Sequence, residues 1–484
     1  MMNIENNVYK NIVAGKYYDS KEGVLIEIKS PIDNSLVGKI QALSIDDVND
    51  IIENAKEAQK TWKKVPINER AQLLHKVADL INEHKDVLAD LMIREVAKDR
   101  KGAYSEIERT CDYIRFTADT AKGMEGESMS SDKFPGFNNS KISVVTREPL
   151  GVVLAISPFN YPVNLSASKI APALVAGNSV VLKPATQGAL SALYLADIFK
   201  EAGVPAGVLN TITGRGSDIG DACVTHNDIS FVNFTGSTEV GKRISSLTVM
   251  KPLLLELGGK DAAIVLEDAD LELTATNIIA GGYSYSGQRC TAVKRILVMD
   301  SVADKLIDIL KEKIAKIKVG NPLEEQVDVV PLIDTKSADF VMELIEDATK
   351  KGATLIAGGN RVGNTVYPTL FDNVTLDMRL AWEEPFGPVL PIIRIKSIDE
   401  AIDIANQSEY GLQSSVFTKD IESAFYVADR LEVGTVQVNN KTERGPDHFP
   451  FLGVKSSGMG TQGIRYSIEA MSRPKATVIN LQRR

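Results

Sequence analysis

Cys290 is the residue in this sequence best suited to attack a carbonyl group. It lies in Ser286-Gly-Gln-Arg-Cys290-Thr, next to Arg289 and after a glycine turn. A nearby cation or a helix N-terminus lowers the pKa of a thiol and favours the nucleophilic thiolate. We therefore predict that Cys290 is an activated nucleophile and that either Arg289 or a helix N-terminus contributes to its activation. The alternative is an inert cysteine in the core.

Two further polar residues follow apolar segments. Glu256 precedes a glycine pair in Leu255-Glu-Leu-Gly-Gly-Lys260, where a buried carboxyl group would have a raised pKa and suit a general base. It could equally be a salt-bridged turn residue. Asn160, in Ser157-Pro-Phe-Asn-Tyr-Pro162, could donate its amide to a developing oxyanion. Its alternative role is to cap the next helix.

Glycine-rich segments suggest a phosphate site but match no strict fingerprint. Gly236-Ser237-Thr-Glu-Val-Gly241-Lys-Arg243 has Arg243 where a P-loop needs Ser or Thr, which disfavours a nucleoside-triphosphate hydrolase. The main-chain N–H groups of a helix that begins there could still bind phosphate. Gly214-Arg-Gly-Ser-Asp-Ile-Gly220 is too long for the dinucleotide fingerprint. Ser166-Ala-Ser-Lys169 lacks the companion motifs of serine acyl-enzymes, so we interpret it as a chance match.

These motifs lie among short apolar segments that alternate with helical patterns. Such alternation predicts parallel sheets covered by helices, and therefore an α/β protein. The first group of predicted strands comprises 151–157, 179–182, 208–212, 229–234 and 262–266, and a second group comprises 295–299, 389–393 and 434–438. Amphipathic helices are predicted from about Ile45 to Ala121 with a break near Pro66, followed by a loop over 129–139. An exposed strand is predicted over 141–147, to which the tail after Ile464 could return.

The composition limits the class of protein. The 484 residues carry a net charge of -9, which argues against a general nucleic-acid binder. No apolar run approaches the roughly 18 residues of a membrane span. The three cysteines do not make a disulfide framework, and the four scattered histidines show no zinc spacing. We expect a cytoplasmic protein with no metal site.

Taken together, the motifs resemble the aldehyde dehydrogenase superfamily over nearly the whole chain. The segments that carry the resemblance are those around Asn160, Glu256 and Cys290, together with Leu182-Lys-Pro-Ala185, Phe234-Thr-Gly-Ser237 and Glu384-Pro-Phe-Gly-Pro388. The resemblance implies that Cys290 attacks an aldehyde, that Asn160 and the Cys290 N–H hold the oxyanion, and that Glu256 activates water to hydrolyse a thioester. Intact Cys290, Glu256 and Asn160 argue against a non-catalytic relative, and Glu256 disfavours a coenzyme-A-dependent one.

The resemblance also implies a cofactor and a substrate. Lys183 would hold the adenosine ribose side, Ser237 the pyrophosphate, and Glu384 the nicotinamide ribose, with Phe386 near the nicotinamide. Gly236 and Gly241 are further predicted cofactor-binding residues. Thr186 stands where many NAD-preferring relatives carry Glu, so NADP is favoured. The segments 444–453 and 463–471 are similar to members that oxidise glyceraldehyde 3-phosphate. In such members an arginine and tyrosine set holds the phosphate, and the corresponding residues here are Arg109, Tyr161, Arg289 and Arg444. Thr291 is a further predicted substrate-binding residue. Lactaldehyde and succinate semialdehyde are the alternative substrates.

The expected fold is that of an aldehyde dehydrogenase, with a Rossmann-like cofactor domain (1–127 and 149–262), an α/β catalytic domain (263–463) and a small oligomerisation β element (128–148 and 464–484). The resemblance implies a homotetramer. An exposed strand edge in the third part would allow pairing between subunits.

Overall fold

The computed structural model describes residues 5–324 and 327–481. Its first large sheet has six strands in the order β10-β9-β8-β11-β12-β24. The strands are β8 Val152–Ser157, β9 Ser179–Pro184, β10 Leu209–Thr211, β11 Ile229–Thr235, β12 Leu253–Glu256 and β24 Gly458–Met459. All neighbours are parallel except β12 and β24. The carboxyl ends of the parallel strands therefore meet at one edge of the sheet.

Helices cover both faces of this sheet, which explains its continuous apolar strands. In β8, Val153 and Ala155 face a core shared with α2, α4, α5 and α6, whereas Val152 and Leu154 face a core shared with α1, α7 and α8. Side chains alternate across a strand, so a strand between two cores must be apolar at every position. The helices are α1 Ile45–Trp62, α2 Ile67–Glu83, α3 Lys85–Val96, α4 Arg100–Lys122, α5 Asn164–Ala176, α6 Ala189–Ala202, α7 Gly216–Thr225 and α8 Thr238–Leu247.

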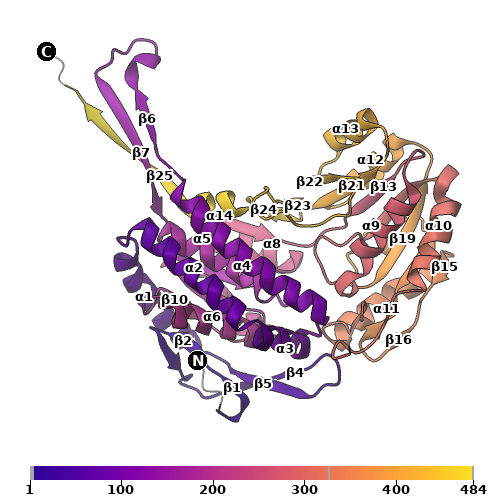
Figure 1. Ribbon diagram of the computed structural model, residues 1–484, viewed down its shortest axis with the longest axis horizontal. Helices are drawn as coiled ribbons and strands as arrows, with labels where there is room; N and C mark the ends of the chain where they lie inside the picture. The colour runs from indigo at the N-terminus through magenta and orange to yellow at the C-terminus, as the bar shows by residue number, and fades with distance from the viewer. Residues whose placement is uncertain (1–4, 325–326, 482–484) are drawn as a thin grey trace.

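The second large sheet has seven strands in the order β15-β18-β19-β14-β13-β21-β22. Its strands are β13 Ala262–Val265, β14 Arg295–Met299, β15 Thr354–Ala357, β18 Thr369–Asp372, β19 Val389–Ile395, β21 Gln413–Phe417 and β22 Thr435–Val438. One face packs on α11 Thr335–Lys350, α12 Ile398–Asn406 and α13 Ile421–Arg430, and the other on α9 Leu271–Tyr283 and α10 Asp300–Ile314. Figure 1 shows this layer beside the first one.

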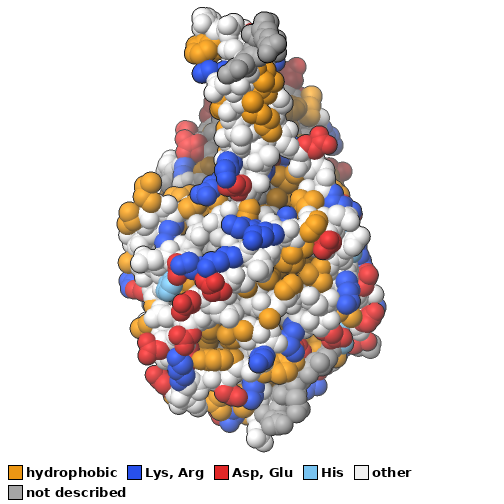
Figure 2. Space-filling model, turned by 90° about the vertical axis from the view of Figure 1, so that its left-hand side faces the viewer, with side chains coloured by type: hydrophobic (Ala, Val, Ile, Leu, Met, Phe, Trp, Pro, Cys, Tyr) orange, Lys and Arg blue, Asp and Glu red, His pale blue; other side chains and the backbone are white. Residues whose placement is uncertain are grey.

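A third, three-stranded sheet projects from the two large layers (Figure 1). It consists of β6 Glu127–Ser130, β7 Lys141–Pro149 and β25 Ser472–Asn480, and α14 Ile464–Ala470 leads into β25. The antiparallel pairing runs from Ser472 opposite Pro149 to Asn480 opposite Lys141. This pairing confirms that the tail returns to the exposed strand. Figure 2 shows apolar side chains on this projecting arm.

The remaining elements are short. They are β1 Val8–Tyr9, β2 Asn11–Val13, β3 Lys16–Tyr18, β4 Leu25–Lys29, β5 Leu36–Gln41, β16 Arg361–Val362, β17 Thr365–Val366, β20 Tyr410–Gly411, β23 Val454–Lys455, η1 Glu5–Asn7, η2 Ser131–Lys133, η3 Ser284–Gly287 and η4 Arg379–Ala381. Within the described residues, no helix has both the length and the apolar composition needed to span a bilayer.

The structure corrects three details of the sequence analysis. The segment 262–266, predicted with the first group of strands, forms β13 in the second sheet, between β14 and β21. Its apolar composition suits either sheet, so only its pairing partners distinguish them. The predicted loop over 129–139 contains the end of β6 and η2. The helical region is broken beyond Pro66 as well, at His84 and again where Ala97 adopts a left-handed conformation before α4. The proposed domain limits stay a prediction.

Glu95 on α3 anchors the helix that follows the predicted cofactor segment. Its buried carboxylate accepts hydrogen bonds from the N–H groups of Gly188, Leu190 and Ser191 at 3.0, 2.7 and 2.9 Å, and from the Ser191 hydroxyl at 2.6 Å. The first turn of α6 has no cap from its own residues, so a carboxylate on another helix serves as its cap. Burial raises the pKa of Glu95 to about 7, and these hydrogen bonds oppose the rise.

We predict that Glu95→Ala lowers the midpoint of thermal unfolding by several degrees. The substitution leaves the donors at the start of α6 buried without an acceptor, at a cost of about 1–3 kcal/mol for each unpaired group. Differential scanning calorimetry measures the change. The control is Glu53→Ala, which removes an exposed carboxylate from α1 and should leave the midpoint unchanged. Coincident melting of the Glu95 variant and the wild type would contradict this role.

Candidate active site

A cavity of about 940 Å³ lies at the carboxyl ends of β8, β9, β11 and β12 and is closed by loops of the second layer. Fourteen of the fifteen predicted site residues line it. They are Asn160, Lys183, Thr186, Gly236, Ser237, Glu256, Cys290, Glu384 and Phe386, together with Arg109, Tyr161, Arg289, Thr291 and Arg444. Residues far apart in the sequence therefore meet at one site.

Cys290 follows a turn that constrains its main chain. Ser286 adopts a φ of 55° and Gly287 a φ of 71°. Residues other than glycine rarely adopt this left-handed backbone conformation. The Ser286 hydroxyl donates to the carbonyl of Val330 at 2.7 Å and accepts from the Val330 N–H at 2.8 Å. A Cβ on Gly287 would lie 2.4 Å from the carbonyl oxygen of Gly387, so only glycine fits. The second layer thus holds the nucleophile loop against the cavity.

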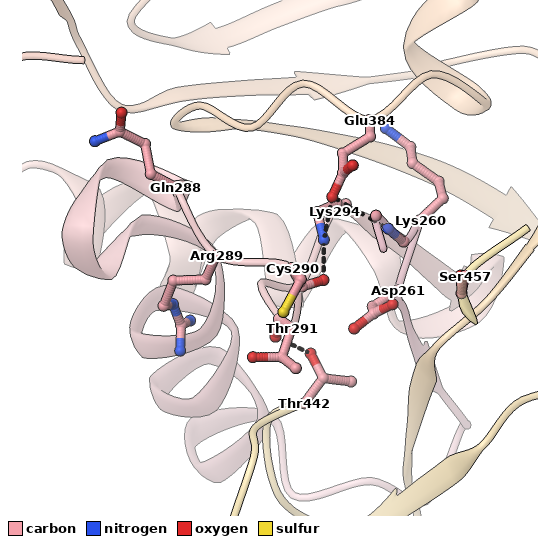
Figure 3. Close-up of polar contacts among 12 residues, drawn as sticks. Lys260, Asp261, Gln288, Arg289, Cys290, Thr291, Lys294, Glu384, Thr442 and Ser457 are labelled. Carbon is pink, nitrogen blue, oxygen red and sulfur yellow. Dashed lines mark hydrogen bonds and ion pairs between the residues drawn. The ribbon is translucent and has the colours of Figure 1, made fainter. Parts of the chain in front are cut away.

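The prediction that Arg289 activates the thiol is wrong. Arg289 donates to the carbonyls of Ala280 and Gly281 in α9, and Figure 3 shows its side chain directed away from that of Cys290. Burial raises the pKa of Cys290 to about 12, and the nearby ammonium of Lys294 opposes this rise. The neighbour in sequence therefore supports the loop, whereas a cation four residues later acts on the thiol.

Asn160 is held next to the nucleophile loop. Its side-chain amide donates to the carbonyl oxygen of Gln288 at 2.9 Å, two residues before Cys290. Its own carbonyl accepts from the Lys98 ammonium at 2.8 Å. Helix α5 begins at Asn164 and has no side-chain cap, so the alternative of a helix-capping Asn160 is wrong. The position fits an oxyanion donor, a role that stays a prediction.

Glu256 ends β12 with its side chain buried at the cavity. Its Oε2 atom lies 3.5 Å from Nη1 of Arg444 and accepts from the Thr235 hydroxyl at 3.4 Å. Among the described residues, its Oε1 atom has no hydrogen-bond partner. Burial raises the pKa of Glu256, and the cations Arg444 and Lys169 oppose this rise. A free acceptor atom and a raised pKa are the properties expected of a general base.

Lys169 is a buried cation that the sequence analysis did not assign. Its ammonium donates to the side-chain oxygens of Asn233 at 3.0 Å and Thr235 at 2.7 Å, and Thr235 also contacts Glu256. Burial lowers the pKa of Lys169 to about 7. The Ser166 hydroxyl donates instead to a main-chain carbonyl one turn earlier. The two polar residues of the Ser-x-x-Lys motif therefore have different partners.

The predicted cofactor residues surround the end of the cavity at β9, α7 and α8. Lys183 is the penultimate residue of β9, and its buried ammonium donates to the carbonyl of Gly214 at 3.2 Å. Gly216 begins α7, and Gly236 with Ser237 precedes α8, so two helix N-termini border the cavity with their N–H groups. These groups and a lysine could bind phosphates, although the glycine spacing departs from both fingerprints.

Gly241 is the exception among the predicted site residues. It lies within α8, and a Cβ built on it would be 2.4 Å from a methyl carbon of Leu257. Its missing side chain therefore allows α8 to pack closely against the segment after β12. This contact indicates a role in helix packing.

Asp447, another residue that the sequence analysis overlooked, joins two of the predicted phosphate-binding arginines. Arg109 donates to both carboxylate oxygens of Asp447, from Nε at 2.7 Å and Nη2 at 2.8 Å, and to the carbonyl of Arg444 at 2.8 Å. Nε of Arg444 lies 3.4 Å from Asp447. Among the described residues, Nη2 of Arg444 is buried without a partner. The spacing Arg444-Gly-Pro-Asp447 was the available sequence signal.

The other predicted substrate residues approach the cavity from separate elements. The Tyr161 ring lies under the ammonium of Lys98, 3.6 Å from the ring centre. Thr291 follows the nucleophile, and its carbonyl accepts from the Thr442 hydroxyl at 2.9 Å (Figure 3). Arg289 binds carbonyls of α9, and its buried Nε atom has no partner among the described residues. These groups give one part of the cavity a cationic and aromatic wall.

Comparisons with known proteins agree with this geometry. The model of the aldehyde dehydrogenase family matches residues 17–477. The NADP-dependent glyceraldehyde-3-phosphate dehydrogenase of Streptococcus equinus is 54% identical over 98% of this chain and 99% of that relative. The lactaldehyde dehydrogenase of Methanococcus aeolicus is 39% identical over 97% of this chain and 99% of that relative.

A solved structure is also similar to this chain, both in sequence and in fold. The NADP-dependent glyceraldehyde-3-phosphate dehydrogenase of Bacillus halodurans, determined in complex with NADP, superposes with a TM-score of 0.96 at 55% identity, over 98% of this chain and 99% of that one. Both the full-length match to the family model and the shared fold confirm the resemblance seen in the sequence. The chain belongs to the aldehyde dehydrogenase family.

Proposed function

We propose that this enzyme oxidises glyceraldehyde 3-phosphate to 3-phosphoglycerate with NADP, through a thiohemiacetal and a thioester on Cys290. The observation that carries the proposal is the meeting of three sets of groups in one cavity: Cys290 with Asn160 and Glu256, the N-terminal ends of α7 and α8, and an arginine cluster. The similarity to NADP-dependent relatives over the full chain supports the same activity.

The residues at the β9 end of the cavity fit NADP. The N-terminal ends of α7 and α8 suit a pyrophosphate, and the Lys183 ammonium suits a ribose hydroxyl or phosphate oxygen. Thr186 offers a neutral hydroxyl beside them, where a carboxylate would repel a 2′-phosphate. Glu384 would accept from the nicotinamide ribose. When bound, NADP supplies an acceptor for the hydride.

The chain's own residues supply the remaining chemistry. The Cys290 sulfur attacks the aldehyde carbon, while the Asn160 amide and the Cys290 N–H stabilise the resulting oxyanion. Loss of hydride from that carbon leaves a thioester. Glu256 then takes a proton from water as the water oxygen attacks the thioester, and the carbon–sulfur bond breaks to release the acid and the thiolate. Inorganic phosphate takes no part, so the test is NADPH formation that does not require added phosphate.

We predict that Glu256→Gln separates the two halves of the reaction. Hydride transfer does not need the carboxylate, whereas hydrolysis loses its base, so stopped-flow absorbance should show an NADPH burst followed by turnover at least about 100-fold slower than wild type. Because Glu256 must be ionised and its pKa is raised, hydrolysis by the wild type should weaken as pH falls through that raised value. A variant without a burst would mean that Glu256 acts before hydride transfer.

We predict that Thr186→Glu weakens NADP binding by about 100-fold with little effect on NAD. A carboxylate next to the 2′-phosphate costs several kcal/mol, and about 1.4 kcal/mol corresponds to a tenfold change. Fluorescence titration with both cofactors measures the change. Thr186→Gln is the matched neutral control and should remain close to wild type. An unchanged preference for NADP in the glutamate variant would place the 2′-phosphate elsewhere.

The arginine cluster is the feature that favours a phosphorylated substrate. Arg109, Arg289 and Arg444 line the same cavity, and forked guanidinium groups suit phosphate oxygens. Lactaldehyde carries no phosphate that these arginines could bind, and succinate semialdehyde presents a single carboxylate. Both alternatives remain open to direct comparison as substrates. The structure also shows that Arg444 contacts Glu256, so a change at Arg444 would affect both phosphate binding and the base.

We therefore predict that Arg109→Leu is the selective change. It should lower kcat/KM for glyceraldehyde 3-phosphate by about 30-fold or more, because truncating one partner of a charged contact costs roughly 2–5 kcal/mol. Oxidation of unphosphorylated glyceraldehyde should barely change. Arg444→Leu should impair both substrates. The control is Arg115→Leu, which removes another cation of α4, one that pairs with Asp79. Equal losses for both substrates in the Arg109 variant would contradict its role.

Two further properties belong to this proposal. β25 is an edge strand with eight of its nine residues exposed, and such an edge can pair with another copy of the chain, which supports a homotetramer. Cys111, Cys223 and Cys290 are all free thiols, which supports action in a reducing compartment such as the cytoplasm.

A further inference from the structure

Lys294 contacts two of the functional groups proposed above but has no part in that mechanism. Its ammonium donates to the carbonyl oxygen of Cys290 and lies 3.1 Å from Oε1 of Glu384 (Figure 3). Only 2% of the side chain is exposed. A lysine this deeply buried loses most of its hydration, so it must be compensated by close partners. Here those partners are the main chain of the nucleophile and the predicted ribose-binding carboxylate.

The same carboxylate also contacts the segment that carries the base. Oε1 of Glu384 accepts from the N–H of Gly259 at 3.1 Å, three residues after Glu256. A Cβ on Gly258 would lie 2.0 Å from Oε2 of Glu384, so this glycine allows the carboxylate to approach the main chain. Lys294 and Glu384 together therefore link the nucleophile loop to the segment after β12.

The position of Lys294 is itself rigid. Its N–H donates to the carbonyl of Asp261 at 2.9 Å, just before β14, and Asp261 precedes β13, the neighbouring strand in the sheet. The main chain that carries this ammonium is therefore fixed at the point where β13 and β14 begin in the second sheet. A long flexible side chain on an exposed loop could not hold two groups in a defined relation.

We propose that Lys294 is a positioning residue that joins the cofactor-binding carboxylate to the nucleophile, fixing the Cys290 main chain and supplying a positive charge to the surroundings of its reacting sulfur. The inference rests on the proposed roles of Cys290 and Glu384. In this proposal, the Lys294 side chain both positions the Cys290 main chain and supplies a positive charge that favours nucleophilic attack.

The charges around the thiol show why this cation matters. Glu256, Asp261 and Glu384 all raise the pKa of Cys290, whereas Lys294 lowers it. Arg444, another cation of the site, is already 3.5 Å from Glu256. Loss of Lys294 would leave the thiol facing carboxylates with little compensation, so the thiolate should form at higher pH.

The test is alkylation of Cys290 by iodoacetamide as a function of pH, with and without NADP. For Lys294→Met, we expect the profile to move to higher pH by about one unit, with alkylation about tenfold slower near neutral pH. The matched control is Lys260→Met, which also removes a buried lysine but one that donates to the carbonyl of Glu383 at 2.7 Å. Its profile should coincide with wild type, and Cys290→Ser defines labelling elsewhere.

A double-mutant cycle tests the link to the cofactor. Lys294→Met and Glu384→Gln should each weaken NADP in a fluorescence titration, but together they should weaken it by less than the product of their separate effects. Lys294→Gln retains a hydrogen-bond donor without the charge and should shift the alkylation profile in the same way as Lys294→Met. It replaces Lys294→Met in the experiment if the methionine variant does not fold.

The proposal is overturned if the Lys294 variants alkylate with the wild-type pH profile, or if the two effects on NADP binding are independent. A lysine needed only for folding would lower thermal stability without moving either measurement. NADPH formation by the wild type, and its loss in the Cys290→Ser variant, test the proposed function separately, so the two proposals can fail independently.

Discussion

The active site depends on the cost of placing ionisable groups out of water. Glu256, Lys169 and Lys294 are buried and Cys290 is partly so, and burial is the largest influence on the pKa of Glu256, Lys169 and Cys290. An isolated charge in such a place is unfavourable, so each must find a partner of opposite charge or a set of hydrogen-bonding groups. The partners lie on other elements, and the positions of the sheets are therefore constrained by the chemistry between them.

This constraint explains why the active site is built from residues of both large sheets. The first sheet presents Glu256 at the end of β12, and Lys169 approaches it from α5 through Thr235. The second layer presents Cys290 and Lys294 just before β14. Glu384 accepts hydrogen bonds from Gly259 and pairs with Lys294, so it bridges the segments that carry the base and the nucleophile. The reactive groups are therefore held by contacts between the layers.

Charged groups also need partners at the end of the cavity where Arg109 and Arg444 lie. Asp447 neutralises part of the charge on Arg109 and Arg444, because its carboxylate contacts both guanidinium groups. Because Arg444 also lies near Glu256, the proposed phosphate-binding group and the proposed general base are in direct electrostatic contact. The residue proposed to select the substrate is thus electrostatically connected to the residue proposed to complete the reaction.

Much of the architecture could be predicted from local sequence. The continuous apolar segments at β8 and β9 indicated strands with two buried faces, and the tail was expected to return to β7. Neighbouring strands in the sequence do not always share a sheet, however. The segment at β13 was assigned to the wrong group because its apolar pattern reports burial and carries no information about which strand pairs with it.

The sequence by itself determined the two α/β layers and the candidate reactive residues, because side-chain periodicity and motif spacing are local properties. Only the tertiary structure decided which charges meet. Arg289 is adjacent to Cys290 in the chain but binds carbonyls of α9, whereas Lys294 reaches the nucleophile and Glu384. Asp447 and Lys169 likewise acquired their roles from partners distant in sequence. Electrostatic interactions depend on separation in space and on burial, and both are set by the packing of the two layers.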